Sequence, residues 1–164
     1  MTPAIMLLEQ LDLPYKVHQY QHDVNCKSFG LEAADKLNVD QQYVFKTLVI
    51  DVDGSYLAVA IIPVAKTLSL KNIAKILKAK KAKMADAHKV QKATGYILGG
   101  VSPFGQKKLL RTIIDDSAKK LNKVFVSGGK RGLEIEILPA DLVKYLQANY
   151  ADIITIQCQH DRQW

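Results

Sequence analysis

The sequence predicts an α+β fold, and the chain from residue 1 to residue 164 is expected to form one domain. Segments with apolar residues at helical spacing are mixed irregularly with short strand-like segments, without the regular strand–helix–strand order of an α/β protein. A chain of 164 residues, 48% of them hydrophobic, is long and apolar enough to build one core. No internal repeat, low-complexity stretch or linker divides it.

The N-terminal half is predicted to contain two capped helices, a strand and a β-hairpin. Thr2 and Ser28 are typical helix caps, and Pro3 stands at the first helical position, where proline is favoured. The turn at 51–54 joins two apolar runs, as in a β-hairpin. The expected elements are a helix from residue 3 that ends at Leu13-Pro14, a strand over 15–20, a helix over 28–37, and hairpin strands over 43–50 and 55–62.

The C-terminal half is predicted to alternate helices with short strands. Ser69 is a typical cap for a helix in which Leu70, Ile73 and Leu77 recur at helical spacing. Pro139 is expected to open the last helix. The other expected elements are a helix over 85–93, a short apolar strand beginning at residue 96, strands over 109–114, 123–126, 133–138 and 153–156, a loop or single helical turn over 115–120, and the last helix over 139–148.

Lys46 is the one charged residue in the apolar run 43–50. Strand residues of this kind usually lie against the core, so a lysine among them either extends to water or points into a polar pocket. On the strand alone an edge-strand lysine that discourages aggregation is favoured, because most lysines are solvated. The alternative is a cation aimed at an anionic or carbonyl-bearing ligand.

Basic residues are concentrated in a few segments. The net charge is +7 and the isoelectric point is near 9.3. Besides the largest cluster, which lies between residues 71 and 92, smaller clusters of basic residues occur at 107–111, 119–123 and 130–131. This uneven distribution indicates a basic face for phosphates, with solvated helix faces as the alternative. The largest cluster has one acid, Asp86, among eight lysines: Lys71, Lys75, Lys78, Lys80, Lys81, Lys83, Lys89 and Lys92.

No pattern in the sequence indicates a metal, a cofactor or a membrane segment. His18, His22, Asp23 and Cys26 are close in sequence, but they fall on a predicted strand and loop without further ligands nearby. Nucleotide-binding glycine motifs and the hydrolase nucleophile elbow are missing. The two cysteines form no disulfide pattern, and there is neither a signal peptide nor an apolar run long enough to span a bilayer. We therefore expect no metal, no cofactor, no membrane partner and a cytoplasmic setting.

Two glycine-rich loops are candidate binding elements. One contains Gly99-Gly100 followed by Ser102-Pro103, and the other is 127–132, with two cations at its end. Backbone N–H groups at paired glycines approach a ligand closely, and they bind phosphate or stabilise an oxygen that gains charge. A pair of tight turns is the alternative. These features indicate a basic α+β domain that is a candidate for binding RNA or nucleotides.

Three motifs in order resemble the YbaK family, the free-standing relatives of the editing insertion domain of bacterial prolyl-tRNA synthetase. They are Lys46-Thr47 in its apolar strand, the loop 99–103 with Gly-x-x-x-Pro spacing, and the segment 126–133. The resemblance covers essentially the whole chain. It implies a mixed, partly barrel-like β-sheet surrounded by helices, no metal, and hydrolysis in trans of cysteine esterified to proline tRNA. It also implies tRNA, not DNA, as the nucleic acid, and prolyl-tRNA synthetase as a candidate partner.

The resemblance also implies site residues. Lys46 matches a lysine that is critical in the family and is thought to position the aminoacyl-adenosine end, with Thr47 beside it. The loop that starts at Gly99 would receive the terminal adenosine or the ester carbonyl. The loop 127–132 lacks the histidine of the alanine-editing insertion domains, which argues against alanine as the main substrate. Other positions expected to contact substrate are Tyr20, Phe29, Gly100, Val101, Ser102, Ser127, Gly128 and Glu134.

Three functional hypotheses follow. The preferred one is a trans-editing deacylase for Cys-tRNA(Pro), in which the thiol of the substrate attacks the ester while the protein supplies orientation and oxyanion contacts. The second is a non-catalytic tRNA-binding or regulatory module with the same fold. The third is a small-molecule hydrolase or transferase that uses Lys46 as an amine nucleophile.

Overall fold

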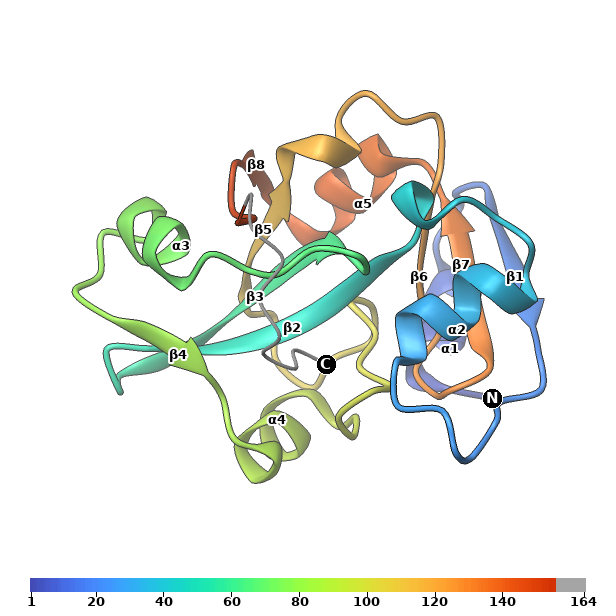
Figure 1. The fold of residues 1–164 in the computed structure, drawn as a ribbon, viewed down its shortest axis with the longest axis horizontal. Helices are drawn as coiled ribbons and strands as arrows, with labels where there is room; N and C mark the ends of the chain where they lie inside the picture. The colour runs from blue at the N-terminus through green and yellow to red at the C-terminus, as the bar shows by residue number, and fades with distance from the viewer. Residues whose placement is uncertain (156–164) are drawn as a thin grey trace.

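The computed structural model describes residues 1–155, and their strands form two sheets (Figure 1). The smaller sheet is antiparallel, and its order is β1 (Tyr15–Gln19), β7 (Leu133–Ile137), β6 (Val124–Ser127). The larger sheet is mixed: β2 is antiparallel to β3 and β4, whereas β5 is parallel to β3 and β8. Its order is β4 (Ala82–Met84), β2 (Phe45–Val52), β3 (Tyr56–Pro63), β5 (Arg111–Asp115), β8 (Asn149–Ala151).

The helices lie around the two sheets, which confirms the predicted α+β class (Figure 1). The smaller sheet, α1 and α2 are at one end of the molecule, and α3, β4 and α4 are at the other. None of the described helices is long and apolar enough to cross a bilayer. The helices are α1 (Pro3–Gln10), α2 (Phe29–Lys36), α3 (Leu70–Ile76), α4 (Ala87–Thr94) and α5 (Pro139–Leu146), with short 3₁₀ helices η1 (Gln41–Tyr43) and η2 (Asp116–Ala118).

Strand β2 is buried on both faces, which explains its nearly continuous apolar sequence. Phe45 and Val49 belong to a core cluster that contains residues of β6, β7 and α5. Leu48 and Ile50 alternate with them and belong to a second cluster under α3. Because successive side chains of a strand point to opposite faces, this one strand connects both cores.

The two sheets meet at a single parallel bridge between Val44 and Phe125, just before β2 and within β6. On the same edge of β2, which is the edge that does not pair with β3, β4 pairs only with residues 50–52. The edge of β2 between these two contacts is therefore open, and within residues 1–155 the sheets approach a barrel without closing into one. This arrangement fits the expected mixed, partly barrel-like sheet.

Two of the three predicted helix caps are present, the third residue lies at its expected position without its bond, and one further cap was not predicted. The side chains of Thr2 and Ser69 accept hydrogen bonds from the N–H groups of Ile5 and Asn72, at 3.3 and 3.1 Å. Asp86 caps α4 in the same way. Ser28 precedes α2 as expected, but its side chain makes no cap hydrogen bond.

Three predicted strands were wrong in whole or in part, and two short strands were missed. The residues after Gly95 form a turn and not a strand, because Tyr96 is buried and its hydroxyl donates to the carbonyl of Phe104 at 2.6 Å. The predicted strand 43–50 begins only at Phe45, because Gln41–Tyr43 form the 3₁₀ helix η1. Strands β4 and β8, of three residues each, were not predicted. The predicted strand 153–156 is reduced to a bridge between Ile154 and Leu68, and residue 156 lies outside the described residues.

Candidate functional site

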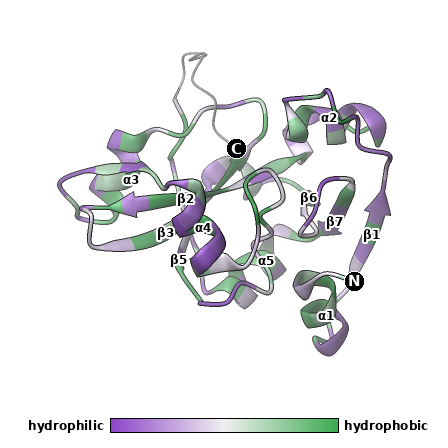
Figure 2. Ribbon diagram, turned by 90° about the horizontal axis from the view of Figure 1, so that it is seen from below, coloured by the Kyte–Doolittle hydropathy of each residue, from purple (hydrophilic) through white to green (hydrophobic). Residues whose placement is uncertain are grey.

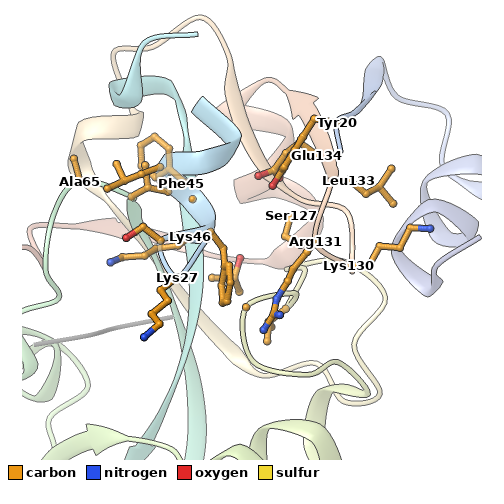
Figure 3. A pocket seen from close by; sticks show the side chains of 18 of the residues that line it. Tyr20, Lys27, Phe45, Lys46, Ala65, Ser127, Lys130, Arg131, Leu133 and Glu134 are labelled. Carbon is orange, nitrogen blue, oxygen red and sulfur yellow. The ribbon is translucent and has the colours of Figure 1, made fainter. Parts of the chain in front are cut away.

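A cavity of about 340 Å³ lies at the open edge of β2, where the two sheets separate (Figure 3). Lys46 and Ser127 each follow the Val44–Phe125 bridge by two residues on strands that run in parallel, so both line the cavity beyond it. The start of α2, the segment 64–67 and the turn at Gly99 complete the wall. The cavity thus collects residues from six separate parts of the sequence: Tyr20, 27–31, 45–47, 64–67, the turn with Gly99 and Val101, and 127–134.

Eight of the eleven residues predicted for the site line this cavity: Tyr20, Phe29, Lys46, Thr47, Gly99, Val101, Ser127 and Glu134. The other three lie behind the lining. Gly100 packs against the backbone of Lys130, and a Cβ added to it would lie 3.2 Å from the Cα of that residue. The buried hydroxyl of Ser102 accepts a hydrogen bond from the N–H of Phe104, and the carbonyl of Gly128 accepts one from Thr2. These three residues shape the two loops from behind.

Lys46 is half-buried in the cavity wall. Burial lowers the pKa of its ammonium group from 10.5 to about 8, because the charged form loses hydration. An aggregation-blocking lysine at a free strand edge would be solvated, whereas the side chain of Lys46 is partly buried in the cavity wall. The position therefore agrees with the interpretation of Lys46 as a cation that faces a ligand.

Two polar side chains in the same cavity have buried atoms without a hydrogen-bond partner among the described residues. Glu134 is 7% exposed and Thr47 is 4% exposed, and the atoms concerned are Oε2 of the first and Oγ1 of the second. Burial raises the pKa of Glu134 from 4.5 to about 8, so its carboxyl group is mainly protonated at pH 7. Leaving buried polar groups unsatisfied costs about 1–3 kcal/mol each, and a bound ligand with polar hydrogens would remove this cost.

Tyr20 lies next to Glu134 on the cavity wall (Figure 3). Burial, followed by the charge of Glu134, raises the pKa of its hydroxyl to about 12, so the phenol stays neutral at physiological pH. Its backbone N–H donates to the carbonyl of Gly132 at 2.9 Å, which ties β1 to the loop 127–132. Tyr20 therefore offers the cavity a neutral hydroxyl and an aromatic ring.

The mouth of the cavity is formed by close contact of Phe29, Gly99 and Arg131. The guanidinium carbon of Arg131 lies 3.9 Å from the centroid of the Phe29 ring, a stacked cation–π geometry. Gly99 has φ +86°, and a Cβ there would lie 2.5 Å from Phe29 and 3.1 Å from Arg131. Only glycine both adopts this backbone conformation and leaves room for the stack.

The segment that leads into α2 is fastened by a buried acid, Glu32. Its carboxylate accepts hydrogen bonds from His22 at 2.6 Å and from the N–H of Asp23 at 2.7 Å, and it pairs with Lys36 at 3.3 Å. Burial would raise the pKa of Glu32, but these hydrogen bonds outweigh it and hold the pKa below its usual value. The clamp fixes residues 20–28, which supply Tyr20 and Lys27 to the cavity.

Besides Lys46, four cations line the cavity, and only two of them belong to a loop that was predicted to bind a ligand. Lys130 and Arg131 belong to the predicted glycine-rich loop, whereas Lys27 and Lys66 were not singled out. All four are exposed. Lys27 precedes α2, whose first residue Phe29 was a predicted site residue, whereas Lys66 follows β3 and has no predicted site residue near it in the sequence. Among residues 1–155, Glu134 is the only acid in the lining, so the mouth is strongly cationic.

The residues considered as metal ligands point to different partners. His18 binds Glu136 at 3.0 Å and His22 binds Glu32, while Cys26 contacts the carbonyl of Ser28. In residues 1–155, no group of three or more histidine, cysteine, aspartate or glutamate side chains is placed to hold a metal ion.

The fold of the chain and its sequence pattern together define the class of protein to which it belongs. The chain belongs to the family of aminoacyl-tRNA editing domains, whose pattern matches residues 24–145. This match covers the cavity-lining segments from Lys27 to Glu134.

Individual relatives agree with this assignment. The chain is 34% identical over 154 residues to the Enterococcus faecalis protein named "Putative Cys-tRNA(Pro)/Cys-tRNA(Cys) deacylase EbsC", covering 94% of this chain and 93% of that protein. A crystal structure described as "a putative trans-editing enzyme for prolyl tRNA synthetase" has the same fold, with a TM-score of 0.78, 20% identity and coverage of 86% and 87% of the two chains. The hypothetical protein APE2540 superposes with a TM-score of 0.84 at 23% identity, over 94% of this chain and 100% of its own.

Proposed function

We propose that this protein is a trans-editing deacylase that hydrolyses the ester between a wrong amino acid and tRNA, with Cys-tRNA(Pro) as its main substrate. The observation that carries the proposal is a cavity in which a half-buried lysine and a buried, unsatisfied carboxyl group lie behind a cationic mouth. Family membership and the name of the E. faecalis relative support the same reaction class.

The shape of the cavity suggests which way the substrate enters. The phosphates of a tRNA 3′ end would remain at the exposed cations of the mouth, Lys27, Lys66 and Lys130, because exposed lysines neutralise phosphate without being desolvated. The aminoacyl group would extend inward toward Glu134 and Thr47. In this orientation Lys46 holds the ester end of the substrate between the mouth and the interior.

Glu134 is suited to receive the α-ammonium group of the substrate. Both Glu134 and Thr47 line the cavity, and the unsatisfied oxygen of each is available to accept a hydrogen bond from an ammonium group. An incoming positive charge favours the carboxylate form, so Glu134 would release its proton on binding. A substrate with a blocked amino group would lose this contact.

The chemistry requires little acid–base machinery, because an aminoacyl ester is already activated. The cysteine thiol forms a bond to the carbonyl carbon, the ester C–O bond breaks, and the thiol proton ends on the released ribose hydroxyl. Water then hydrolyses the resulting thiolactone to free cysteine. The protein contributes orientation of the reacting groups and hydrogen bonds to the carbonyl oxygen.

A panel of misacylated tRNAs tests the proposal. We expect release of cysteine from Cys-tRNA(Pro), little release of alanine or proline from the same tRNA, and loss of about 100-fold or more in rate with Lys46→Ala. Replacing the substrate cysteine by serine should slow the reaction sharply. A protein that binds tRNA but leaves every ester intact over hours would instead be the non-catalytic module.

The lowered pKa of Lys46 favours one alternative enough to require its own test. With a pKa of about 8, roughly a tenth of this amine is unprotonated at pH 7, as an amine nucleophile requires. Borohydride reduction during turnover, followed by mass spectrometry, would trap a substrate adduct on Lys46 if it attacked a carbonyl-bearing small molecule. We expect no adduct, because the proposed role of Lys46 is to position the ester.

A further inference from the structure

A second group of basic residues lies away from the cavity, on the edge strand β4 and on the helices α3 and α4 that flank it. We call residues 70–94 the basic lobe. It carries the eight lysines between residues 71 and 92, and all eight are exposed. In Figure 2 the helix α4 is among the most hydrophilic parts of the molecule that this view shows.

The acids near the basic lobe are already engaged within the protein. Asp51 pairs with Lys89 at 2.9 Å, and this hydrogen bond holds the pKa of Asp51 below its usual value. Asp53 accepts the backbone N–H groups of Lys80 and Lys81 at 3.0 and 2.7 Å, and Asp86 caps α4. Apart from Lys89, the lysines of the lobe form no ion pair with any described residue.

The lobe is a rigid support for these lysines. Ile73 and Leu77 of α3 are buried in the second core cluster and Val90 of α4 is buried in the first, so the two helices flank β2 on opposite faces, and β4 pairs with the end of β2 between them. The carboxylate of Asp53 also fixes the turn that carries Lys80 and Lys81. The surface is therefore preformed, which lowers the entropic cost of binding an extended partner.

The basic lobe and the cavity belong to opposite ends of β2. Lys46 lies near the start of this strand, and β4 pairs with its last residues, a separation of about 20 Å at the rise of an extended strand. Helix α4 ends at Gly95 and leads directly into the turn that brings Gly99 and Val101 to the cavity wall. Figure 1 shows α4 and this turn along the same side of β2.

We propose that the basic lobe binds the backbone of the duplex arm of tRNA whose 3′ end enters the cavity. A single-stranded end in the cavity places the adjoining duplex outside the mouth, and the lobe is a rigid basic surface within reach of it. Double-stranded RNA is recognised mainly through phosphates and ribose hydroxyls, which suits clustered lysines without aromatic side chains. This inference rests on the proposed function. Because such contacts are independent of sequence, the lobe would supply affinity without selecting among tRNAs.

Matched lysine substitutions separate the lobe from the rest of the surface. The test variant combines Lys75→Gln, Lys80→Gln and Lys92→Gln, one each from α3, the following turn and α4. It leaves Lys89, which pairs with Asp51, and Lys78, which has φ +56°. The control combines Lys16→Gln, Lys120→Gln and Lys144→Gln, which removes the same charge from exposed positions outside the lobe. Thermal melts check that both variants are folded.

Binding of uncharged tRNA is measured over a range of salt concentrations, and hydrolysis is measured with Cys-tRNA(Pro) and with cysteinyl-adenosine, which lacks the duplex. We expect the lobe variant to reduce the magnitude of the negative slope of log K against log salt by about 3, roughly one for each lysine. It should also slow hydrolysis of Cys-tRNA(Pro) but not of cysteinyl-adenosine. The control variant should behave like the wild type on both substrates.

Equal effects of the two triple variants, or unchanged tRNA binding by the lobe variant, would overturn the assignment. So would unchanged tRNA binding together with loss of binding to anionic phospholipid vesicles, which would assign the lobe to a membrane surface. Failure of the wild type to hydrolyse either ester would contradict the proposed function separately, since tRNA binding is measured without hydrolysis.

Discussion

At the scale of residues, the burial of Lys46, which is proposed to position the ester, is expected to lower the stability of the folded protein. Burial disfavours its charged form and lowers its pKa to about 8. In the unfolded chain the pKa returns to 10.5, so the cost of burying the charge is fully present below pH 8 and fades as the pH rises from 8 to 10.5. A side chain retained at such a cost is typical of a binding or catalytic position.

We therefore predict that Lys46→Met stabilises the protein while it removes deacylation. Methionine has a similar length and no charge to desolvate, so the free energy of unfolding at pH 7 should rise by about 1 kcal/mol. The gain should shrink toward pH 10, and urea unfolding at the two pH values measures it. Lys16→Met, at an exposed position on β1, is the control and should show no such pH dependence. A loss of stability in Lys46→Met would indicate that the ammonium group is stabilising in the free protein.

Glu134 should show the opposite dependence on pH. Its pKa is raised from 4.5 to about 8, so the folded protein holds a proton that the unfolded chain releases between these values. The free energy of unfolding should therefore fall as the pH rises from about 5 to 8, by at most about 1.4 kcal/mol per pH unit.

Glu134→Gln should remove this pH dependence and weaken binding of substrates with a free amino group. Glutamine retains the shape of the side chain but does not ionise, so the variant should be more stable than the wild type at pH 8. Unfolding by urea from pH 5 to pH 9, with Glu9→Gln as an exposed control, measures the difference. Parallel stability curves for the wild type and Glu134→Gln would contradict the assigned ionisation.

At the scale of elements, the turn at Gly99 depends on the packing of two other segments. Phe29 comes from α2 and Arg131 from the loop 127–132, and both would collide with a side chain at Gly99. Gly99→Ala should reduce stability by about 1–3 kcal/mol and lower activity, because it strains the backbone and separates the stacked pair.

Gly54→Ala provides a matched control for this prediction. Gly54 also has positive φ, +65°, but no atom lies within 4 Å of a Cβ added there. It should therefore show only the backbone cost of about 1 kcal/mol, with normal deacylation. Thermal melts and the deacylation rate report both effects, and equal losses in the two variants would show that crowding at the mouth is unimportant.

The longer elements could be predicted from the sequence because local signals specify them. The hairpin of β2 and β3 follows from two apolar runs around a turn, and α1 follows from its cap and proline. Strands β4 and β8 are too short to show a period, and they exist because they pair with the edges of β2 and β5. Tyr96 was misassigned to a strand because its burial depends on a distant carbonyl acceptor, which no local pattern shows.

The candidate site could be predicted only in part for the same reason. The motif residues were found through a resemblance, and eight of them meet in the cavity. Lys27 and Lys66 were missed because they come from connecting segments, and only the tertiary structure brings them to the mouth. The clamp by Glu32 was also missed, since its partners belong to a loop whose path the sequence does not reveal.

At the scale of the whole molecule, β2 connects the two surfaces for which functions are proposed. The sheets are joined at Val44–Phe125 and then separate, which opens the cavity at one end of β2. The other end of the same strand carries β4 and the basic lobe. A tRNA bound along this axis would place its ester in the cavity and its duplex on the lobe.

The most direct test compares hydrolysis of Cys-tRNA(Pro) by the wild type and by Lys46→Met at pH 7, with both proteins shown to be folded and to bind uncharged tRNA equally. The proposed function predicts rapid release of cysteine by the wild type and a rate close to the uncatalysed one for the variant. Equal release of cysteine by the two proteins would contradict it, because cleavage of the ester would then not depend on the lysine in the cavity.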